Sequence, residues 1–329
     1  MDETRRLRLG LVGCGIIARR HGGWLRHDPR VDWQVVCDPR PEAAESFRNE
    51  FATTAKIETD FAAALDRHSL DAVILCTPNA QHYPQTCAAL DRGLHVLCEK
   101  PLALRREEID DLIVRTAASG KIVSVAHQRR YLGAYRTARR ELTERAELYG
   151  PIHAVQLYLC EGWSQSIVGT WRDDPTQNLG YFGDAGIHLI DVVHFVSGLQ
   201  AERLYAVSDR RGCKVEVTTR VLIRWSGGVD GSAQFIGDAH HFREDIHFHG
   251  RAADLLIRDG RVLRCCDGRC EPIADPLPDG NPTTAWLDAI ESGCPTVSPP
   301  EVARPILDWN QGVMASLRID DWIDVDSSA

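Results

Sequence analysis

The chain has 329 residues, of which 43% are hydrophobic and 26% are charged, so it is long enough for two domains that each bury a core. Its net charge of -9 argues against a nucleic-acid-binding protein, because that function needs a basic surface that displaces counterions from phosphate. No apolar run reaches the roughly 20 residues of a membrane-spanning helix. We therefore expect a cytoplasmic protein with no membrane partner.

The cysteines do not form a recognisable disulfide framework. Most of the eleven lie in apolar runs, as Cys37 and Cys98 do, and we interpret them as small buried thiols. Cys265, Cys266 and Cys270 form a cluster near the end of the chain, but it lacks the second pair that a zinc site needs. We therefore expect no metal.

Short apolar runs alternate with amphipathic stretches in the first part of the chain. The runs predict buried strands, and the stretches between them predict helices with recognisable ends, such as Pro41 in a first turn and Gly93 and Gly120 at carboxyl ends. Strands that alternate with helices are typical of a doubly wound parallel sheet, an α/β fold. The predicted strands are Leu7–Val12, Trp33–Cys37, Ala72–Cys76, Leu94–Cys98 and Ile122–Ala126.

Strands dominate after Ala126, and Gly227-Gly228 and Asp259-Gly260 stand between strand-like runs at the spacing of antiparallel hairpins. We therefore expect a second, α+β domain with mostly antiparallel strands, and place the domains at residues 1–126 and 127–329, with a C-terminal helix packing back onto the first. Its predicted strands are 152–159, 204–207, 215–225, 229–235, 245–249 and 255–257, and its predicted helices are 133–148, 184–196, 283–291 and 302–317.

The stretch Gly13–Ala18 follows the first strand and opens the first helix, a position in which a GxGxxA pattern predicts a dinucleotide-binding loop. Gly13 allows the tight turn, Gly15 lets the backbone approach a pyrophosphate, and the helix start at Ile16 and Ile17 offers unpaired N–H groups to the phosphates.

Asp38 stands about 20 residues further on, at the end of the second strand, where an acid accepts a hydrogen bond from the adenosine ribose of NAD and repels the extra phosphate of NADP. Arg40 works in the opposite direction, because an arginine accommodates that phosphate. We expect NAD, with NADP as the alternative.

Thr77-Pro78-Asn79 and His82 follow the strand that ends at Cys76, at the same edge of the sheet. Asn79 and His82 are candidates to face the dinucleotide, while helix capping is an equally good explanation of Asn79.

Glu99-Lys100-Pro101 follows the apolar run Leu94–Cys98. Ligands bind at the carboxyl ends of the strands in an open parallel sheet, so we expect Lys100 to project into a crevice and to be catalytic. The alternative interpretation is an ordinary loop lysine beside a turn proline.

Asp184 and His188 lie four residues apart in a predicted helix and therefore share one face. Histidine titrates near neutral pH, which suits a group that takes a proton from an alcohol, and Asp184 is placed to orient it. Asp191 is either part of this site or a structural residue.

Together these stretches resemble the Gfo/Idh/MocA oxidoreductase family, which includes glucose-fructose oxidoreductase and inositol dehydrogenase. The matching residues run in order through nearly the whole chain: Gly13, Gly15 and Ala18; Thr77-Pro78-Asn79 and His82; Glu99-Lys100-Pro101; Arg129-Arg130-Tyr131; and Asp184, Gly186, His188 and Asp191.

The resemblance implies an amino-terminal Rossmann domain, an open antiparallel sheet in the second domain, and a sugar, cyclitol or polyol substrate bound beside the nicotinamide. It implies that Lys100 holds both the reacting hydroxyl and the nicotinamide ribose, with Glu99 as a further cofactor contact. It also implies that His188 is the general base and that Asp184 tunes it. Candidate substrate contacts are Gln128, Arg129, Trp163, Trp171 and Arg172, although both tryptophans are as readily explained as core residues.

The first functional hypothesis is an NAD-dependent dehydrogenase that acts on a secondary alcohol. The second is an enzyme that uses the same cofactor without net redox change, and the third is a dinucleotide-binding regulator, which has no need of Lys100, Asp184 and His188 together. An exposed sheet face in the second domain, and the resemblance, favour a homodimer or homotetramer.

Overall fold

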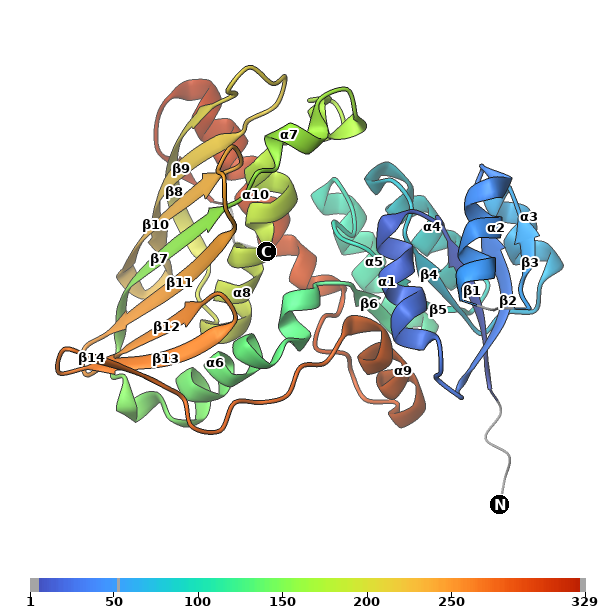
Figure 1. The fold of residues 1–329 in the computed structure, drawn as a ribbon, viewed down its shortest axis with the longest axis horizontal. Helices are drawn as coiled ribbons and strands as arrows, with labels where there is room; N and C mark the ends of the chain where they lie inside the picture. Colours follow the sequence, from blue (N-terminus) through green and yellow to red (C-terminus); the bar gives the residue numbers. More distant parts are fainter. Residues whose placement is uncertain (1–5, 52–53, 326–329) are drawn as a thin grey trace. The chain divides into compact units, whose positions relative to one another are not determined.

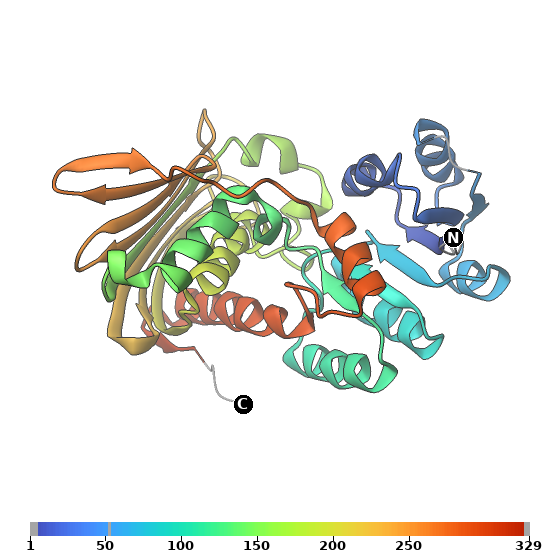
Figure 2. The same cartoon turned by 90° about the horizontal axis from the view of Figure 1, so that it is seen from below.

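The computed structural model describes residues 6–51 and 54–325. The chain forms two compact units (Figures 1 and 2). The first unit extends to Gln128 and also includes Gly280–Arg304, while the second comprises Arg129–Asp279 and the chain from Pro305. Thus a segment from late in the sequence belongs to the amino-terminal unit.

The first unit is built on a six-stranded, fully parallel sheet in the order β3-β2-β1-β4-β5-β6, the strand order of a Rossmann fold. The predicted α/β class is confirmed, although β3 was not predicted. The strands are β1 (Leu7–Val12), β2 (Val31–Cys37), β3 (Lys56–Glu58), β4 (Ala72–Leu75), β5 (His95–Cys98) and β6 (Val123–Val125). The helices are α1 (Ile16–Leu25), α2 (Pro41–Glu50), α3 (Phe61–Arg67), α4 (Asn79–Asp91), α5 (Arg106–Ser119) and α9 (Pro282–Ser292).

Several predicted helix ends are found in this unit. Helix α2 begins at Pro41, and Gly93 and Gly120 follow α4 and α5 with φ of 70° and 64°. Asn79 does not cap α4, because it is the first helical residue and Pro78 takes the cap position without a side-chain hydrogen bond. The capping interpretation of Asn79 is therefore wrong.

Helix α9 covers part of one sheet face through fully buried apolar residues. Trp286 and Leu287 pack with Leu9, Ile74 and Leu97 in a single core cluster. Burying a tryptophan of this size stabilises the contact by a few kcal/mol. This burial explains why α9 belongs to the first unit although it is distant in sequence.

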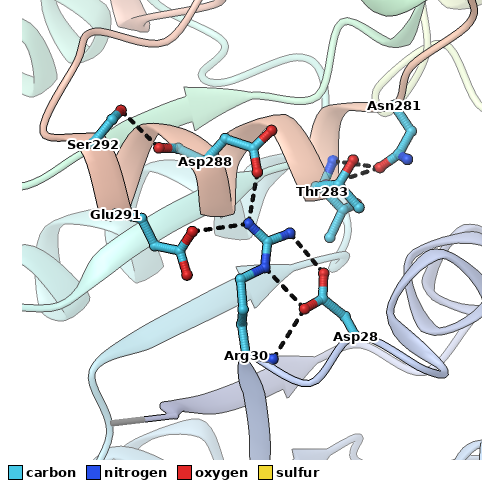
Figure 3. A network of polar contacts seen from close by, with 8 residues as sticks. Asp28, Arg30, Asn281, Thr283, Asp288, Glu291 and Ser292 are labelled. Carbon is cyan, nitrogen blue, oxygen red and sulfur yellow. Dashed lines mark hydrogen bonds and ion pairs between the residues drawn. The ribbon is translucent and has the colours of Figure 1, made fainter. Parts of the chain in front are cut away.

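A polar network adds to that packing in the carboxyl-terminal half of α9 (Figure 3). The Arg30 guanidinium donates to Asp28 through Nε (2.9 Å) and Nη2 (2.7 Å), and through Nη1 to Asp288 (2.6 Å) and Glu291 (3.2 Å). Hydrogen bonds from Arg30 hold the pKa of Asp28 below its ordinary value. One arginine therefore joins the start of β2 to α9.

The second unit contains a nine-stranded sheet in the order β14-β13-β12-β11-β7-β10-β9-β8-β15. It is antiparallel except for the parallel pair β7 and β10, so the prediction of a mostly antiparallel sheet is confirmed. Strands β14 and β15 were not predicted, and β13 was expected only as the strand-like run that follows Asp259-Gly260. The strands are β7 (Ile152–Cys160), β8 (Ala201–Asp209), β9 (Thr218–Trp225), β10 (Val229–Ile236), β11 (Arg243–Gly250), β12 (Asp254–Arg258), β13 (Arg261–Cys266), β14 (Arg269–Pro272) and β15 (Ile323–Asp324).

Helices α6, α8 and α10 cover one face of this sheet, and the described residues place no helix on the other face (Figures 1 and 2). The predicted hairpins are found between β9 and β10 and between β12 and β13. The helices are α6 (Gly133–Glu144), α7 (Ser164–Ile167), α8 (Ile187–Ser197) and α10 (Ala303–Ile319).

Cys265 and Cys270, two members of the cysteine cluster, form a disulfide across the β13–β14 hairpin, a pairing that the sequence analysis did not predict. Among the described residues, no group of histidine, cysteine and acidic side chains could hold a metal ion, and no helix is long and apolar enough to cross a membrane.

We expect Arg30→Leu to lower the free energy of unfolding by about 1 kcal/mol at pH 7, because it removes a paired arginine that bridges three carboxylates. The loss should shrink as the pH falls through the pKa of Asp28, since a carboxylate with a lowered pKa stabilises the fold only while it is ionised. Urea unfolding at pH 7 and pH 3 measures both effects. Arg105→Gln, which breaks only the exposed pair with Glu108, is the control, and an equal loss in both variants would contradict the prediction.

Candidate active site

The loop between β1 and α1 has the geometry that its glycines predict. Gly13 has a φ of 85°, and a Cβ atom there would lie 2.5 Å from the backbone oxygen of Cys76, so only glycine fits. A Cβ atom at Gly15 would meet nothing within 4 Å. The backbone at Gly15 therefore faces open space at the start of a helix.

This start of α1 suits a dinucleotide phosphate. Gly15 is the N-cap residue and makes no side-chain cap, and the first turn contains no acidic residue. Uncapped N–H groups and the positive end of the helix dipole favour a phosphate at this position. Ile16 is 87% exposed, which leaves an apolar surface for a ligand to cover. The residues present therefore fit a dinucleotide.

Asp38 ties the end of β2 to this loop. Its Oδ2 accepts a hydrogen bond from the backbone N–H of Cys14 (2.9 Å), and its Oδ1 accepts one from the N–H of Arg40 (3.0 Å). The Arg40 side chain is 68% exposed and reaches Asp38 only at 3.4 Å. Burial, with the charge of Asp38 adding to it, raises the pKa of Cys14 to about 12, so this thiol is neutral at pH 7.

His82 joins the ends of β4 and β5. It is 1% exposed, and its Nδ1 and Nε2 lie 2.7 Å and 2.8 Å from the carbonyl oxygens of Pro101 and Thr77. Burial lowers the pKa of His82, although the two carbonyls favour the charged ring. The hydroxyl of Thr77 donates to Gln85 (2.6 Å). The predicted cofactor contacts of Thr77, Pro78, Asn79 and His82 stay predictions.

Glu99 and Lys100 directly follow β5, at the same sheet edge as the phosphate loop. Both side chains are partly buried, and the Lys100–Pro101 peptide bond is cis. The Lys100 N–H donates to Oε2 of Glu99 (3.2 Å), while Oε1 of Glu99 lies 3.0 Å from Nε2 of His21. Glu99 thus folds back onto the backbone that carries Lys100.

Asp184 lies in a π-helical segment, Phe182–Gly186, which runs directly into α8. The regular helix predicted from Asp184 therefore begins only at Ile187. Local π-helical turns are often found at functional sites. Oδ2 of Asp184 accepts hydrogen bonds from Trp163 Nε1 (3.2 Å) and Arg172 Nε (3.1 Å).

Arg172 combines exposure with a fixed position. Its side chain is 45% exposed and stacks on the ring of Trp171, 4.5 Å from the centroid, and both terminal nitrogens lack a hydrogen-bond partner among the described residues. Trp163 is only 8% exposed and belongs to the core, whereas Trp171 is 42% exposed. The core interpretation therefore applies to Trp163, and the substrate contact of Trp171 stays a prediction.

His188 is the second residue of α8 and is partly buried. Asp191, one turn later, is 1% exposed and accepts hydrogen bonds from Nε (2.9 Å) and Nη2 (2.6 Å) of Arg130. Two of the motifs in the sequence therefore meet in one buried ion pair. This pairing favours the structural interpretation of Asp191, since it orients α8.

Arg129 is held in a second buried cluster. It pairs with Glu244 on β11, and the Tyr135 hydroxyl donates to the same carboxylate. Gln128 accepts a hydrogen bond from Arg20 (3.1 Å) at the end of the first unit. The predicted substrate contacts of Gln128 and Arg129 stay predictions.

Sequence reasoning missed His21 and Glu244, which contact Glu99 and Arg129, and it missed Thr283, which contacts His21. His21 lies on the buried face of α1, and a histidine at an apolar position of a helix was the available signal. Nothing in the sequence pairs Thr283 or Glu244 with the site, because their partners are distant along the chain.

Two models of one family match most of the chain. The model described as "Oxidoreductase family, NAD-binding Rossmann fold" matches residues 7–127, and that of the "GFO/IDH/MocA C-terminal domain" matches residues 135–255. The chain belongs to the Gfo/Idh/MocA oxidoreductase family. Its first unit is the NAD-binding Rossmann fold of that family.

Curated relatives and solved structures agree with this assignment. D-glucoside 3-dehydrogenase of Escherichia coli is 28% identical over 59% of this chain, but only 55% of that protein's length is covered. The 1,5-anhydro-D-fructose reductase of Ensifer adhaerens is 28% identical over 82% of this chain and 83% of its own. The structure of scyllo-inositol dehydrogenase from Lactobacillus casei with NAD(H) and scyllo-inositol shares the fold, with a TM-score of 0.83, 19% identity and coverage of 98% and 100% of the two chains.

We expect Gly13→Ala to lower the stability of the first unit and Gly15→Ala to lower its affinity for NAD. Gly13→Ala should destabilise the first unit by about 2 kcal/mol, because the position has a positive φ and the Cβ atom meets a backbone oxygen. Gly15→Ala should fold normally and bind NAD roughly tenfold more weakly, because the methyl group enters the space for the pyrophosphate. Thermal melts and fluorescence titration with NAD measure the two effects. Normal NAD binding by Gly15→Ala would contradict the assignment of this loop.

Proposed function

We propose that the protein is an NAD-dependent dehydrogenase that oxidises a secondary alcohol of a sugar, cyclitol or polyol, with NADP as the alternative cofactor. The observation that carries the proposal is the position of Lys100, a partly buried lysine at the strand edge that also holds the phosphate loop. The names of the relatives, a D-glucoside 3-dehydrogenase and a 1,5-anhydro-D-fructose reductase, support this substrate class.

The cofactor, when it is bound, accepts a hydride from the carbon that carries the hydroxyl. In the proposal the Lys100 ammonium group donates a hydrogen bond to the oxygen of that hydroxyl, and His188 takes its proton. The carbon loses a hydride and the oxygen a proton, so a carbonyl group forms. Asp184 is a fixed negative charge that favours the protonated state of His188. The loop residues Gly13, Gly15, Ile16 and Ile17 hold the pyrophosphate, with Asp38 and Arg40 beside the adenosine ribose.

Arg172 supports a role for its loop in substrate binding. Its two terminal nitrogens are available as donors, and the exposed ring of Trp171 lies beside them. Polar donors next to an aromatic face suit a polyhydroxylated ring. We assign Arg172 and Trp171 to the substrate side, together with Gln128 and Arg129. Trp163 contributes from the core, through the hydrogen bond that its Nε1 donates to Asp184.

Three further expectations belong to this proposal. Residues 1–126 bind the cofactor, and residues 127–329 bind the substrate and form the subunit interface. The enzyme is a cytoplasmic homodimer or homotetramer, which the exposed Val207 and Leu222 on neighbouring strands of the uncovered sheet support. Light scattering after gel filtration measures the assembly.

A reaction without net redox change is the second candidate, since transient oxidation beside a glycosidic bond or another leaving group uses the same residues. Cofactor that stays oxidised at steady state, with a product at the oxidation level of the substrate, would favour it. A dinucleotide-binding regulator is the third and weakest candidate, because it has no use for Lys100, Asp184 and His188.

We expect Lys100→Met and His188→Ala to lower kcat by roughly a hundredfold or more, because each removes a group that binds or moves a proton in the transition state. NAD affinity should change little in His188→Ala. The substrate for this test comes from a screen of polyols, sugars and sugar acids with NAD and NADP, followed by the absorbance of the reduced cofactor. Arg105→Gln is the control. Unchanged turnover in either variant would refute the catalytic assignment.

A further inference from the structure

A buried chain of hydrogen bonds in the first unit leads from α9 to Lys100. Thr283 Oγ1 lies 2.7 Å from Nδ1 of His21, whose Nε2 lies 3.0 Å from Oε1 of Glu99. Oε2 of Glu99 accepts the backbone N–H of Lys100 (3.2 Å). Thr283 is 0% and His21 1% exposed. These hydrogen bonds thus join three elements: α9, α1 and the end of β5.

The chemistry of these groups determines which of them donate hydrogen bonds and which accept them. An ionised carboxylate only accepts, so Nε2–H of His21 donates to Glu99. In the neutral imidazole Nδ1 is then an acceptor, and the Thr283 hydroxyl is the donor that satisfies it. Both oxygens of Glu99 are occupied, one by His21 and one by the Lys100 backbone. The carboxylate is therefore held in a single orientation.

Thr283 has this position because of the way in which α9 begins. Asn281 Oδ1 accepts the N–H groups of Thr283 (3.1 Å) and Thr284 (2.9 Å), and Pro282 takes the first helical position (Figure 3). A hydroxyl, a histidine and a carboxylate in a row resemble a nucleophilic triad. Thr283 is fully buried, however, so no substrate reaches it, and the arrangement acts only through Glu99.

Neighbouring groups favour the ionised form of the Glu99 carboxyl group. Burial raises the pKa of Glu99, but the hydrogen bond from His21 and the charge of Lys100 outweigh it, so that the pKa lies below its ordinary value. The other titratable groups that act on this charge are His82 and the thiols of Cys76 and Cys98. Burial favours the neutral form of all three, so Glu99 is the negative charge beside Lys100.

We infer that His21 and Thr283 are positioning residues, which hold the carboxylate of Glu99 against the backbone N–H of Lys100 and so fix the segment from which the Lys100 side chain reaches the substrate. The inference rests on the proposed role of Lys100. It assigns to α9, which comes late in the sequence, a part in the catalytic machinery of the first unit.

The split between kcat and KM tests this inference. Glu99→Gln keeps the size of the side chain but weakens the two hydrogen bonds that the carboxylate accepts, and it should lower kcat by roughly tenfold. Thr283→Val removes one hydrogen bond and should lower kcat by roughly threefold to tenfold.

Thr283→Ser keeps the hydroxyl and should restore kcat. In all three variants the KM for NAD should change less than about twofold, a change worth under 0.5 kcal/mol. A kcat that stays at the wild-type value in both Glu99→Gln and Thr283→Val would overturn the inference. So would an equal loss of turnover in Thr283→Ser and Thr283→Val.

A second measurement does not depend on turnover. Nitrogen NMR of 15N-histidine-labelled protein, with His21→Gln used to assign the signal, should give a His21 that carries a proton on Nε2 in the wild type and in Thr283→Ser, and an altered signal in Thr283→Val. This result in a protein that oxidises no alcohol would refute the proposed function and leave the hydrogen-bonded chain in place. A wild-type His21 protonated at Nδ1 alone would overturn the inference.

Discussion

The parallel register of the first sheet is the constraint on which the candidate site depends. Because β1, β2, β4 and β5 run in the same direction, the residues that follow them emerge at one edge. This places Gly13, Asp38, Thr77 and Lys100 at that edge, although they are distant in sequence. The loop after β1 also lies close to the loop after β4, since the backbone at Gly13 lies against that of Cys76. A side chain at residue 13 would push apart the strands whose ends make up the site.

Many of the charged residues in the motifs bind one another and hold the site in shape. Arg130 and Asp191 form a buried ion pair, and Arg129 is paired with Glu244. Buried ion pairs contribute little net stability, but they are costly to break, so they orient the elements that carry them. In the second unit, Arg172 is different, because it donates one N–H to Asp184 and its terminal nitrogens have no hydrogen-bond partner among the described residues. Arg130 is thus held within the fold by its ion pair, whereas Arg172 keeps donors for a ligand.

Helix α9 connects the architecture of the first unit with its chemistry. Trp286 and Leu287 bury it on the Rossmann sheet, and Arg30 bridges its acidic face to β2. Once the helix is fixed in this way, Thr283 in its first turn reaches His21. Apolar packing supplies the free energy that holds α9 on the sheet. The hydrogen bonds from Thr283 through His21 to Glu99 follow from the position that this packing sets.

The sequence by itself determined the class of the fold, the phosphate loop, most strands of both sheets and the two motif stretches around Lys100 and His188. These are local patterns, since strand periodicity, turn glycines and capping residues act over a few residues. Tertiary structure alone decided that α9 joins the first unit, that Cys265 pairs with Cys270, and that Asp184 lies in a π-helical turn. It also decided the partners of Arg129, Asp191 and Glu99. Each of these depends on groups that only the folded chain brings together, and spacing along the sequence contains no information about such distances.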